Sequence, residues 1–180
     1  MKLIIAEKPE LARAISRAVS GDEEKCEGYV KKGEYFITWA FGHLLTLKEP
    51  EDYDKEKYKS WKIERLPIYF EEWEHKEGKE SYKKSQLKII KNLLKQSDSV
   101  IHAGDPDSEG QYLIDELLTF YKYNKPVKRI LINDNNTEYI KKAFLTLEDN
   151  EKFSGMSKSA YARSVGDLIF GINMSRYFTV

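Results

Sequence analysis

Residues 99–110 read Ser-Val-Ile-His-Ala-Gly-Asp-Pro-Asp-Ser-Glu-Gly, and this stretch decides the fold class. A short apolar run ends in a turn of small residues that carries three carboxylates, Asp105, Asp107 and Glu109. In open α/β sheets, ligands bind beyond the carboxyl ends of the strands, so the turn predicts both a buried strand and a site. Three acids this close repel one another unless a cation offsets their charge, and Mg²⁺ takes oxygen ligands of this kind.

Strands alternate with helices on both sides of this turn. Apolar runs at 3–6 and 127–132 predict two more strands, and a Tyr- and Val-rich stretch at 29–41 predicts a pair joined near Gly33. Helical spacing of apolar residues predicts helices over 9–19, 82–96, 112–120, 137–147 and 158–178. This order predicts an α/β fold with a parallel-rich sheet covered on both faces, interrupted by a long excursion at 48–80.

The composition bounds the class of protein. The 180 residues carry 30 Lys and Arg against 30 Asp and Glu, which excludes a uniformly basic coat for nucleic acid but not a local patch. Cys26 is the only cysteine, so an intrachain disulfide and a four-cysteine zinc site are excluded, and a cytoplasmic setting is favoured. No apolar run approaches the ~18 residues of a membrane span, and we expect no secretory leader.

Two further segments place polar side chains after predicted strands. Glu7 and Lys8 follow the first strand, and His43 follows the stretch that ends at Gly42. In a parallel sheet these strand ends share one edge, so we expect the Glu7 carboxylate to face that of Asp105. A cation at Lys8 would then contact a phosphate.

Simpler explanations exist for each of these residues. An acidic turn before a helix serves as a cap and a partner for the helix dipole, and a lone His43 is more often a hydrogen-bonded structural residue. Glu7 and Lys8, taken singly, are typical solvated residues. Three spaced acids together with Glu7 favour a metal site. The motif leaves open phosphatases with an aspartyl nucleophile, phospho-receiver domains, nucleotidyl transfer and DNA strand cleavage.

Several motifs in order resemble one family. Glu7 with residues 105–110 resembles the TOPRIM signature of type IA topoisomerases, bacterial primases and some nucleases. The segments that resemble type IA enzymes, or their topoisomerase III branch, are 5–12, 38–45, 53–54, Trp61, 66–68, Gln111, 132–134 and 163–176. The resemblance spans essentially the whole chain. It implies a Rossmann-like TOPRIM domain at 1–150, and at 151–180 the beginning of the following helical, DNA-binding domain.

The resemblance also implies roles for single residues. Asp105 and Asp107 would hold Mg²⁺ with Glu7 beside them, and Glu109 would be an outer-sphere or second-metal ligand. Glu7 would also transfer a proton at the DNA 3′-oxygen, Lys8 would steady the scissile phosphate, and His43 is a weaker active-site candidate.

DNA contacts are implied for residues of the excursion and the last helix. These residues are Trp61, Arg163, Asp167, Leu168 and Arg176. An ion pair within the helix is the simpler explanation for Arg163 and Asp167, and Trp61 could anchor the excursion on the core. Ser108 and Leu168 depart from the family pattern, which has Arg and Trp there, so a cation near the phosphate and a stacking surface are expected to be lost.

The implied activity is that of a topoisomerase III, whose N-terminal part this chain would form. Such enzymes relax and decatenate DNA without ATP, by cleaving and resealing one strand through a 5′-phosphotyrosine. None of the 12 tyrosines matches the motif of that nucleophile, so we expect it outside this chain, in further domains of a longer protein. The implied partners are single-stranded DNA segments and those domains, with no membrane, in the cytoplasm with the nucleoid. The alternatives are a freestanding TOPRIM nuclease and a non-catalytic module that binds single strands.

Overall fold

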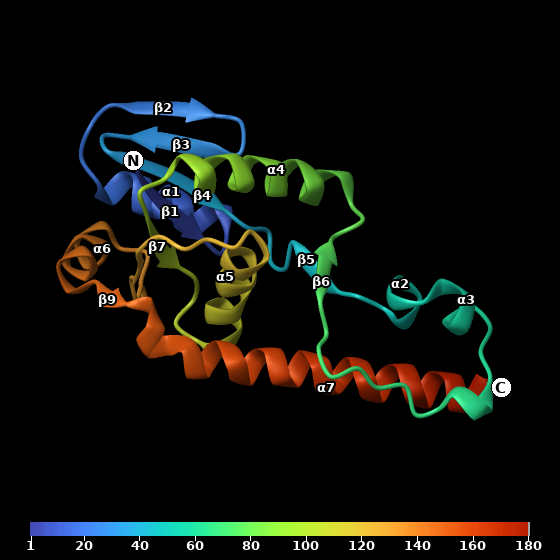
Figure 1. Ribbon diagram of the computed structural model, residues 1–180. Coiled ribbons are helices and arrows are strands. Elements are labelled where there is room, and N and C mark those ends of the chain that lie inside the picture. The colour runs from blue at the N-terminus through green and yellow to red at the C-terminus, as the bar shows by residue number, and fades with distance from the viewer. Residues whose placement is uncertain (180) are drawn as a thin grey trace.

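A computed structural model describes residues 1–179 as a mixed sheet between two layers of helices (Figure 1). The seven-stranded sheet has the order β2-β3-β4-β1-β7-β8-β9. Its strands are β1 (Lys2–Ala6), β2 (Glu23–Cys26), β3 (Tyr29–Lys32), β4 (Tyr35–Trp39), β7 (Ser99–Ala103), β8 (Val127–Arg129) and β9 (Glu148–Asp149). The helices around it are α1 (Pro9–Ala18), α4 (Ser81–Gln96), α5 (Ser108–Phe120), α6 (Thr137–Ala143) and α7 (Ser154–Thr179).

The centre of the sheet is parallel and its edges are antiparallel. Strand β1 pairs in parallel with β4 and β7, and β7 pairs in parallel with β8. The hairpin partners β2 and β3, and the short β9, run antiparallel. The predicted α/β class and parallel-rich sheet are therefore confirmed. Strands β2 and β9 were not predicted, because β2 is a charged edge strand and β9 has two residues.

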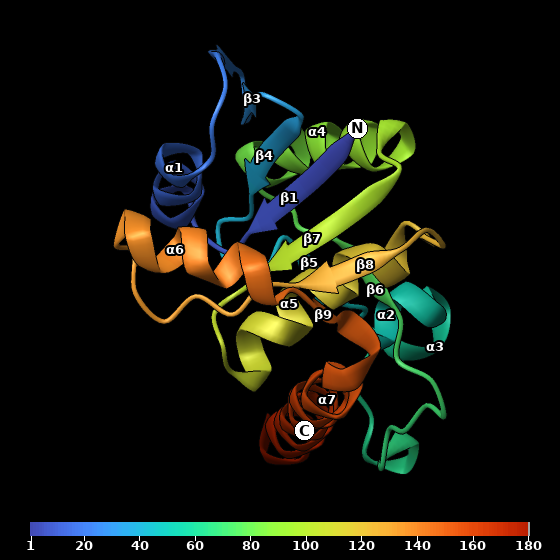
Figure 2. The ribbon, with the colours of Figure 1, turned by 90° about the vertical axis from the view of Figure 1, so that its left-hand side faces the viewer.

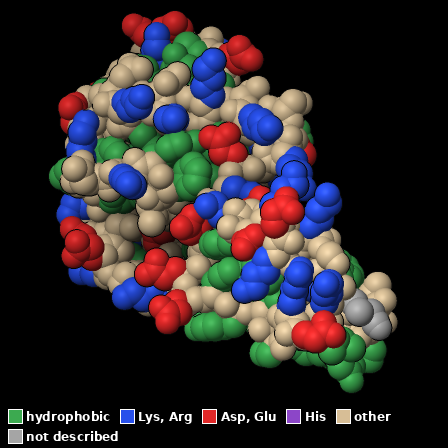
Figure 3. Space-filling model, turned by 45° about the vertical axis from the view of Figure 1, so that its right-hand side comes forward, with side chains coloured by type: hydrophobic (Ala, Val, Ile, Leu, Met, Phe, Trp, Pro, Cys, Tyr) green, Lys and Arg blue, Asp and Glu red, His purple; other side chains and the backbone are tan. Residues whose placement is uncertain are grey.

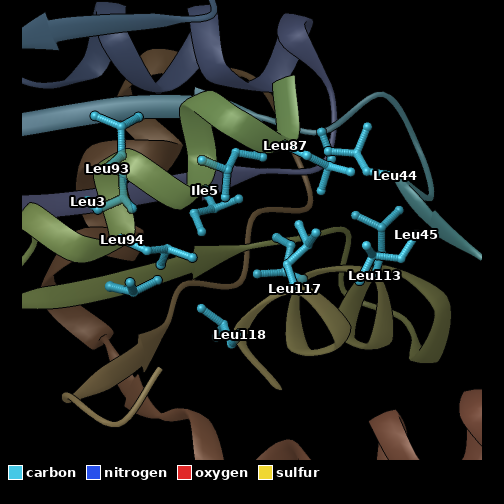
Figure 4. Packing of buried hydrophobic residues seen from close by; sticks show 14 residues of the cluster. Leu3, Ile5, Leu44, Leu45, Leu87, Leu93, Leu94, Leu113, Leu117 and Leu118 are labelled. Carbon is cyan, nitrogen blue, oxygen red and sulfur yellow. The ribbon is translucent and has the colours of Figure 1, made fainter. Parts of the chain in front are cut away.

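Helices cover both faces of the sheet (Figure 2). Side chains alternate along β1, so Leu3 and Ile5 pack toward α4 and α5, whereas Ile4 packs toward α1 and α6. Figure 4 shows Leu3 and Ile5 among leucines of α4 and α5. All three β1 residues are fully buried, which explains why the strand is continuously apolar.

Some predicted boundaries were wrong. Helix α5 begins at Ser108, inside the acidic turn, and strand β8 ends at Arg129 rather than at Ile132. The α-helical part of α6 ends at Ala143 and passes into a 3₁₀ turn, η2 (Phe144–Thr146). Capping decides the first of these differences, because the Asp107 side chain satisfies a backbone N–H in the first turn of α5.

The excursion at 48–80 folds against α7. It contains α2 (Pro50–Tyr53), α3 (Lys55–Tyr58), the 3₁₀ turn η1 (Ile63–Arg65) and β6 (His75–Glu77), which pairs with β5 (Leu45–Leu47). The third 3₁₀ turn, η3 (Asn150–Phe153), comes directly before α7. Asn173 of α7 fastens the excursion, because its amide group donates to the Ile68 carbonyl and accepts from the Ile68 N–H. No helix within residues 1–179 is long and apolar enough to cross a membrane.

Candidate metal and nucleic-acid site

The ends of β1 and β7 bring three predicted site residues together. Ala6 and Ala103 are register partners at these ends, so the residues that follow them are neighbours. The Asp105 N–H donates to Glu7 Oε2 over 3.0 Å. Lys8 Nζ lies 3.1 Å from Glu7 Oε1 and 2.9 Å from Asp105 Oδ2. The expected juxtaposition of Glu7 and Asp105 is therefore present, with an ammonium between their carboxylates.

The charges of this group differ in their access to water. The Glu7 side chain is 12% exposed, whereas that of Lys8 is 57% exposed. Hydrogen bonds from Lys8 to Asp105 and then to Glu7 raise the pKa of the lysine, so it stays protonated at neutral pH. The position between the two carboxylates therefore accommodates a cation, and it opens to solvent on the lysine side.

Two glycines let the segment 104–110, which carries the three carboxylates and is called the acidic loop, pack closely against Glu7. A Cβ atom at Gly104 would lie 2.1 Å from the Gly110 carbonyl oxygen. A Cβ at Gly110 would lie 2.5 Å from Asp105 backbone atoms and 2.7 Å from Glu7 Oε2. Real Cβ contacts are essentially never under 3.0 Å, so both positions require glycine for this packing.

Asp107 caps the helix that follows the loop. Its Oδ1 accepts from the Gly110 N–H over 2.7 Å, at the N-terminus of α5. The simpler explanation of the acidic turn as a helix cap is thus correct for Asp107. The side chain is exposed, so its second oxygen faces solvent and is free for another ligand.

A buried arginine under the loop was not predicted. Arg129 is 1% exposed and donates to Gln111 Oε1 and to the carbonyls of His102, Gly104, Ile130 and Asp105. Burial lowers the pKa of Arg129 to about 10, against the effect of nearby carboxylates. The only signal in the sequence is the alternation of strand β8, in which Lys128 faces solvent and its neighbour faces the interior.

His43 lies beside the loop, between two glutamates. Its Nδ1 is 2.9 Å from Glu116 Oε1 and its Nε2 is 2.5 Å from Glu109 Oε1. The Glu116 contact, followed by that of Glu109, raises the pKa of His43 to about 9 against the effect of burial. His43 is therefore a cation at neutral pH and donates from both nitrogens.

This histidine connects Glu109 to residues that the sequence did not single out. Glu116 is 5% exposed, and burial raises its pKa. Its other oxygen lies 3.5 Å from Nε2 of His75, which is 2.6 Å from the Tyr112 hydroxyl. A glutamate inside the apolar face of α5 was the available signal for this group.

The acidic loop fits Mg²⁺ better than it fits a metal that needs a full protein cage. No three His, Cys, Asp or Glu side chains within residues 1–179 are arranged to hold a metal by themselves. Mg²⁺ is usually held by one or two carboxylates, with waters and phosphate oxygens completing its shell. Glu7 and Asp105 supply such a pair, and the Lys8 ammonium already stands in for a cation between them.

Four of the five predicted DNA contacts line one hollow between α7 and the excursion. This hollow has a volume of about 380 Å³, and its lining includes Trp61, Asp167, Leu168 and Arg176. Arg163 lies one turn earlier on α7 and is exposed. Among the described residues, the arginine of α7 that forms an ion pair is Arg176, with Glu51, whereas Arg163 and Asp167 do not pair with each other, so a DNA contact of these two residues stays a prediction.

Arg176 has a structural role in this hollow. It is 5% exposed, and its guanidinium lies 2.6 Å from Glu51 Oε1 and donates to the Tyr58 carbonyl. It also stacks over the Trp61 ring, 5.1 Å from the centroid. Trp61 is still 41% exposed, so one face of this ring is open to a ligand.

Comparisons with known proteins agree on the domain. The model of the Toprim domain family matches residues 2–135. The chain is 43% identical over 99% of its length to DNA topoisomerase 3 of Vibrio cholerae, 40% identical to that of Pasteurella multocida and 37% identical to that of Bacillus cereus. It spans 28%, 28% and 24% of those relatives.

A solved structure is similar in fold. Topoisomerase I from Thermotoga maritima superposes on 93% of this chain and 24% of its own, with a TM-score of 0.59 and 17% identity. At that identity the likeness concerns the fold alone.

Proposed function

The chain belongs to the Toprim family, and on that premise we propose that it forms the Mg²⁺- and DNA-binding part of a type IA DNA topoisomerase of the topoisomerase III branch. The observation that carries this proposal is the convergence of Glu7, Lys8 and Asp105 at the ends of β1 and β7. The matched region is 28% of each of these two relatives, so the activity is proposed for the longer protein.

In that protein a tyrosine outside these residues attacks a DNA phosphodiester, which leaves a 5′-phosphotyrosine and a 3′-hydroxyl. Resealing reverses the step, so the bond energy is kept and no ATP is needed. Mg²⁺ would be held by Glu7 and Asp105, with the second oxygen of Asp107 joining when a DNA phosphate completes the shell and Glu109 as an outer or second ligand, and it would supply charge stabilisation at the phosphate.

The side chains around the acidic loop have separate roles in this proposal. In the step at the leaving 3′-oxygen, Glu7 would be protonated, with Asp105 and Asp107 holding the cation; it would give this proton in cleavage and take it back in religation. Lys8 donates to a phosphate oxygen and neutralises charge there, for which its exposed ammonium is suited. His43 orients Glu109 through their hydrogen bond and acts as a positioning residue.

The hollow beside α7 is proposed to hold a single strand of DNA. The open face of Trp61 suits stacking against a base. Asp167 and Leu168 line the same hollow with Glu49 and Glu51, and these acids suit the exocyclic amines of a base better than a phosphate. Arg163 would contact the strand from the next turn of α7, and Arg176 holds the Trp61 ring in place.

The domain boundary follows the same proposal. Residues 1–150 form the Toprim domain, and residues 151–180 begin the following helical unit. Of the described residues of α7, only Ala160 and Arg176 are buried, and Phe170 is 68% exposed. A helix that buries so little of itself on the sheet domain is expected to belong to a further unit of the longer protein, which acts on DNA in the cytoplasm, with the nucleoid.

The test is the binding of Mg²⁺ to the 180-residue chain in the presence of a single-stranded oligonucleotide, measured by calorimetry. Asp105→Asn is expected to weaken Mg²⁺ binding at least tenfold, whereas Asp22→Asn, at an exposed acid remote from the loop, leaves it unchanged. Equal Mg²⁺ affinity in Asp105→Asn and the parent chain would refute the metal site. Mg²⁺-dependent hydrolysis of the oligonucleotide by this chain alone would instead support a freestanding nuclease.

A further inference from the structure

Helix α4 carries a row of exposed lysines. Lys84, Lys88, Lys91 and Lys95 are spaced by four, three and four residues, which places them on one face of the helix. All four are exposed, whereas Leu87 and Ile90 of the same helix are buried in the core. The sixteen residues of α4 include no Asp or Glu. We call these four residues the lysine row.

The lysine row has no carboxylate partners. Within residues 1–179, no Asp or Glu oxygen lies within 4.0 Å of any of the four ammonium groups, although Lys83 on the same helix pairs with Glu80. Other exposed lysines, such as Lys128, Lys141 and Lys152, have an acidic partner, and those that have none in the described part of the chain, such as Lys62 and Lys158, are not aligned on one helix face with other lysines. Like charges at this spacing destabilise a helix by a few tenths of a kcal/mol per pair. In a chain of zero net charge, this row is therefore a local excess of positive charge, without a carboxylate in ion-pair contact among residues 1–179.

More lysines extend the row at its C-terminal end. Lys122 and Lys125 line a hollow of about 200 Å³ together with Lys91 and Lys95. Lys91 also lies over the Tyr121 ring, 5.7 Å from its centroid. Figure 3 shows Lys and Arg side chains, with some Asp and Glu among them, over the upper part of the molecule, where α4 lies beside β2 and β3 in Figure 1.

The lysine row leads away from the acidic loop. Ser97 ends α4 and leads directly into β7, whose opposite end carries Asp105. The Lys95 end of the row therefore lies at the edge of the sheet opposite to Glu7 and Asp105. A ligand on the row makes contacts separate from those of the candidate metal site.

We propose that the lysine row, with Lys122 and Lys125, binds the phosphate backbone of duplex DNA as a second contact of this domain. The inference rests on the proposed function for the assignment of DNA as the polyanion. From Lys84 to Lys95 the row spans ~16 Å at ~1.5 Å per residue, about five base pairs at ~3.4 Å each. None of the four residues of the row is aromatic, and the Tyr121 ring beneath Lys91 is partly buried, so the row suits the backbone of a rigid duplex better than a single strand that needs a stacking platform.

The experiment measures duplex affinity of the 180-residue chain against salt concentration in EDTA, so that Mg²⁺ does not contribute. Wild type is compared with the quadruple variant Lys84→Gln, Lys88→Gln, Lys91→Gln and Lys95→Gln. The matched control replaces the four paired lysines Lys31, Lys128, Lys141 and Lys152 by Gln, which removes the same charge. Circular dichroism melts check that both variants are folded.

Each neutralised phosphate contributes about 0.9 to the slope of log K against log salt, so the row variant is expected to lower the slope by about 3 to 4. The control variant is expected to keep the wild-type slope. Equal slopes in both variants would overturn the proposal, because net charge and not position would then decide binding. Tighter binding to a single strand of the same length, equally lost in the row variant, would overturn the assignment to duplex. Mg²⁺ binding by Asp105 is untouched by either variant, so failure here is distinct from failure of the proposed function.

Discussion

Replacing Gly110 by alanine tests whether the acidic loop depends on close backbone packing. In an ordinary helix the change would stabilise the protein by ~0.5–1 kcal/mol, because glycine loses more chain entropy on folding. At Gly110 the new Cβ would lie 2.5 Å from Asp105 backbone atoms, which cannot swing away as a flexible side chain can. Overpacking of this kind costs typically ~1–3 kcal/mol, so the steric term wins.

The same chain offers a matched control. Gly166 lies inside α7, and a Cβ there meets no atom within 4 Å. Gly166→Ala should therefore stabilise by ~0.5–1 kcal/mol, opposite in sign to Gly110→Ala.

Thermal unfolding of both variants measures the two effects. For a domain of this size ~1–3 kcal/mol corresponds to a loss of roughly 3–9 °C in Tm for Gly110→Ala, against a small gain for Gly166→Ala. Gly110→Ala should also weaken Mg²⁺ binding, because relief of the clash moves Asp105 away from Glu7. A Gly110→Ala protein that melts with or above the parent would refute the packing argument, provided that Gly166→Ala shows its gain.

Three other substitutions test the supports of the site. Arg129→Lys keeps the charge but leaves several buried carbonyls without a donor. The free energy of unfolding, measured in urea, should therefore fall by at least ~2 kcal/mol, and a fall under ~0.5 kcal/mol would contradict the role of Arg129 in holding the loop. The pKa of His43 is raised in the folded state, so its contribution to the free energy of unfolding is full below pH 6.5 and is lost as the pH rises through about 9. The shift corresponds to ~3 kcal/mol, reduced to ~1–2 because a third of the ring is exposed, and His43→Gln should remove this decline between pH 6.5 and 9.5. Asn173→Leu removes both hydrogen bonds to Ile68 and should speed proteolysis of the excursion without changing Mg²⁺ binding; cleavage at the parent rate would refute the fastening role.

The sequence predicts the parts of this molecule that depend on local pattern. The continuous apolar runs of β1 and β7 identify buried strands, and the acids after them identify the sheet edge. Boundaries failed where a single side chain decides them, as when Asp107 starts α5 inside the turn. Arg129 was missed because a basic residue near a strand end is ordinarily solvated, and only the tertiary fold buries it under the loop. Arg176, similarly, was expected to contact DNA, but in the structure its guanidinium forms an ion pair with Glu51.

The supports of the acidic loop bear on how a cation would bind there. Arg129 and the two glycines fix the loop backbone, so binding needs little further ordering of the chain. The protein nevertheless contributes few oxygens, since Asp107 is partly used by the helix cap and Glu109 by His43. Under the proposed function the missing oxygens come from a DNA phosphate. A cation and DNA then complete one another's site, and by linkage each raises the affinity of the other by the same factor. The Lys8 ammonium, already between the carboxylates, keeps Glu7 and Asp105 together until that exchange occurs.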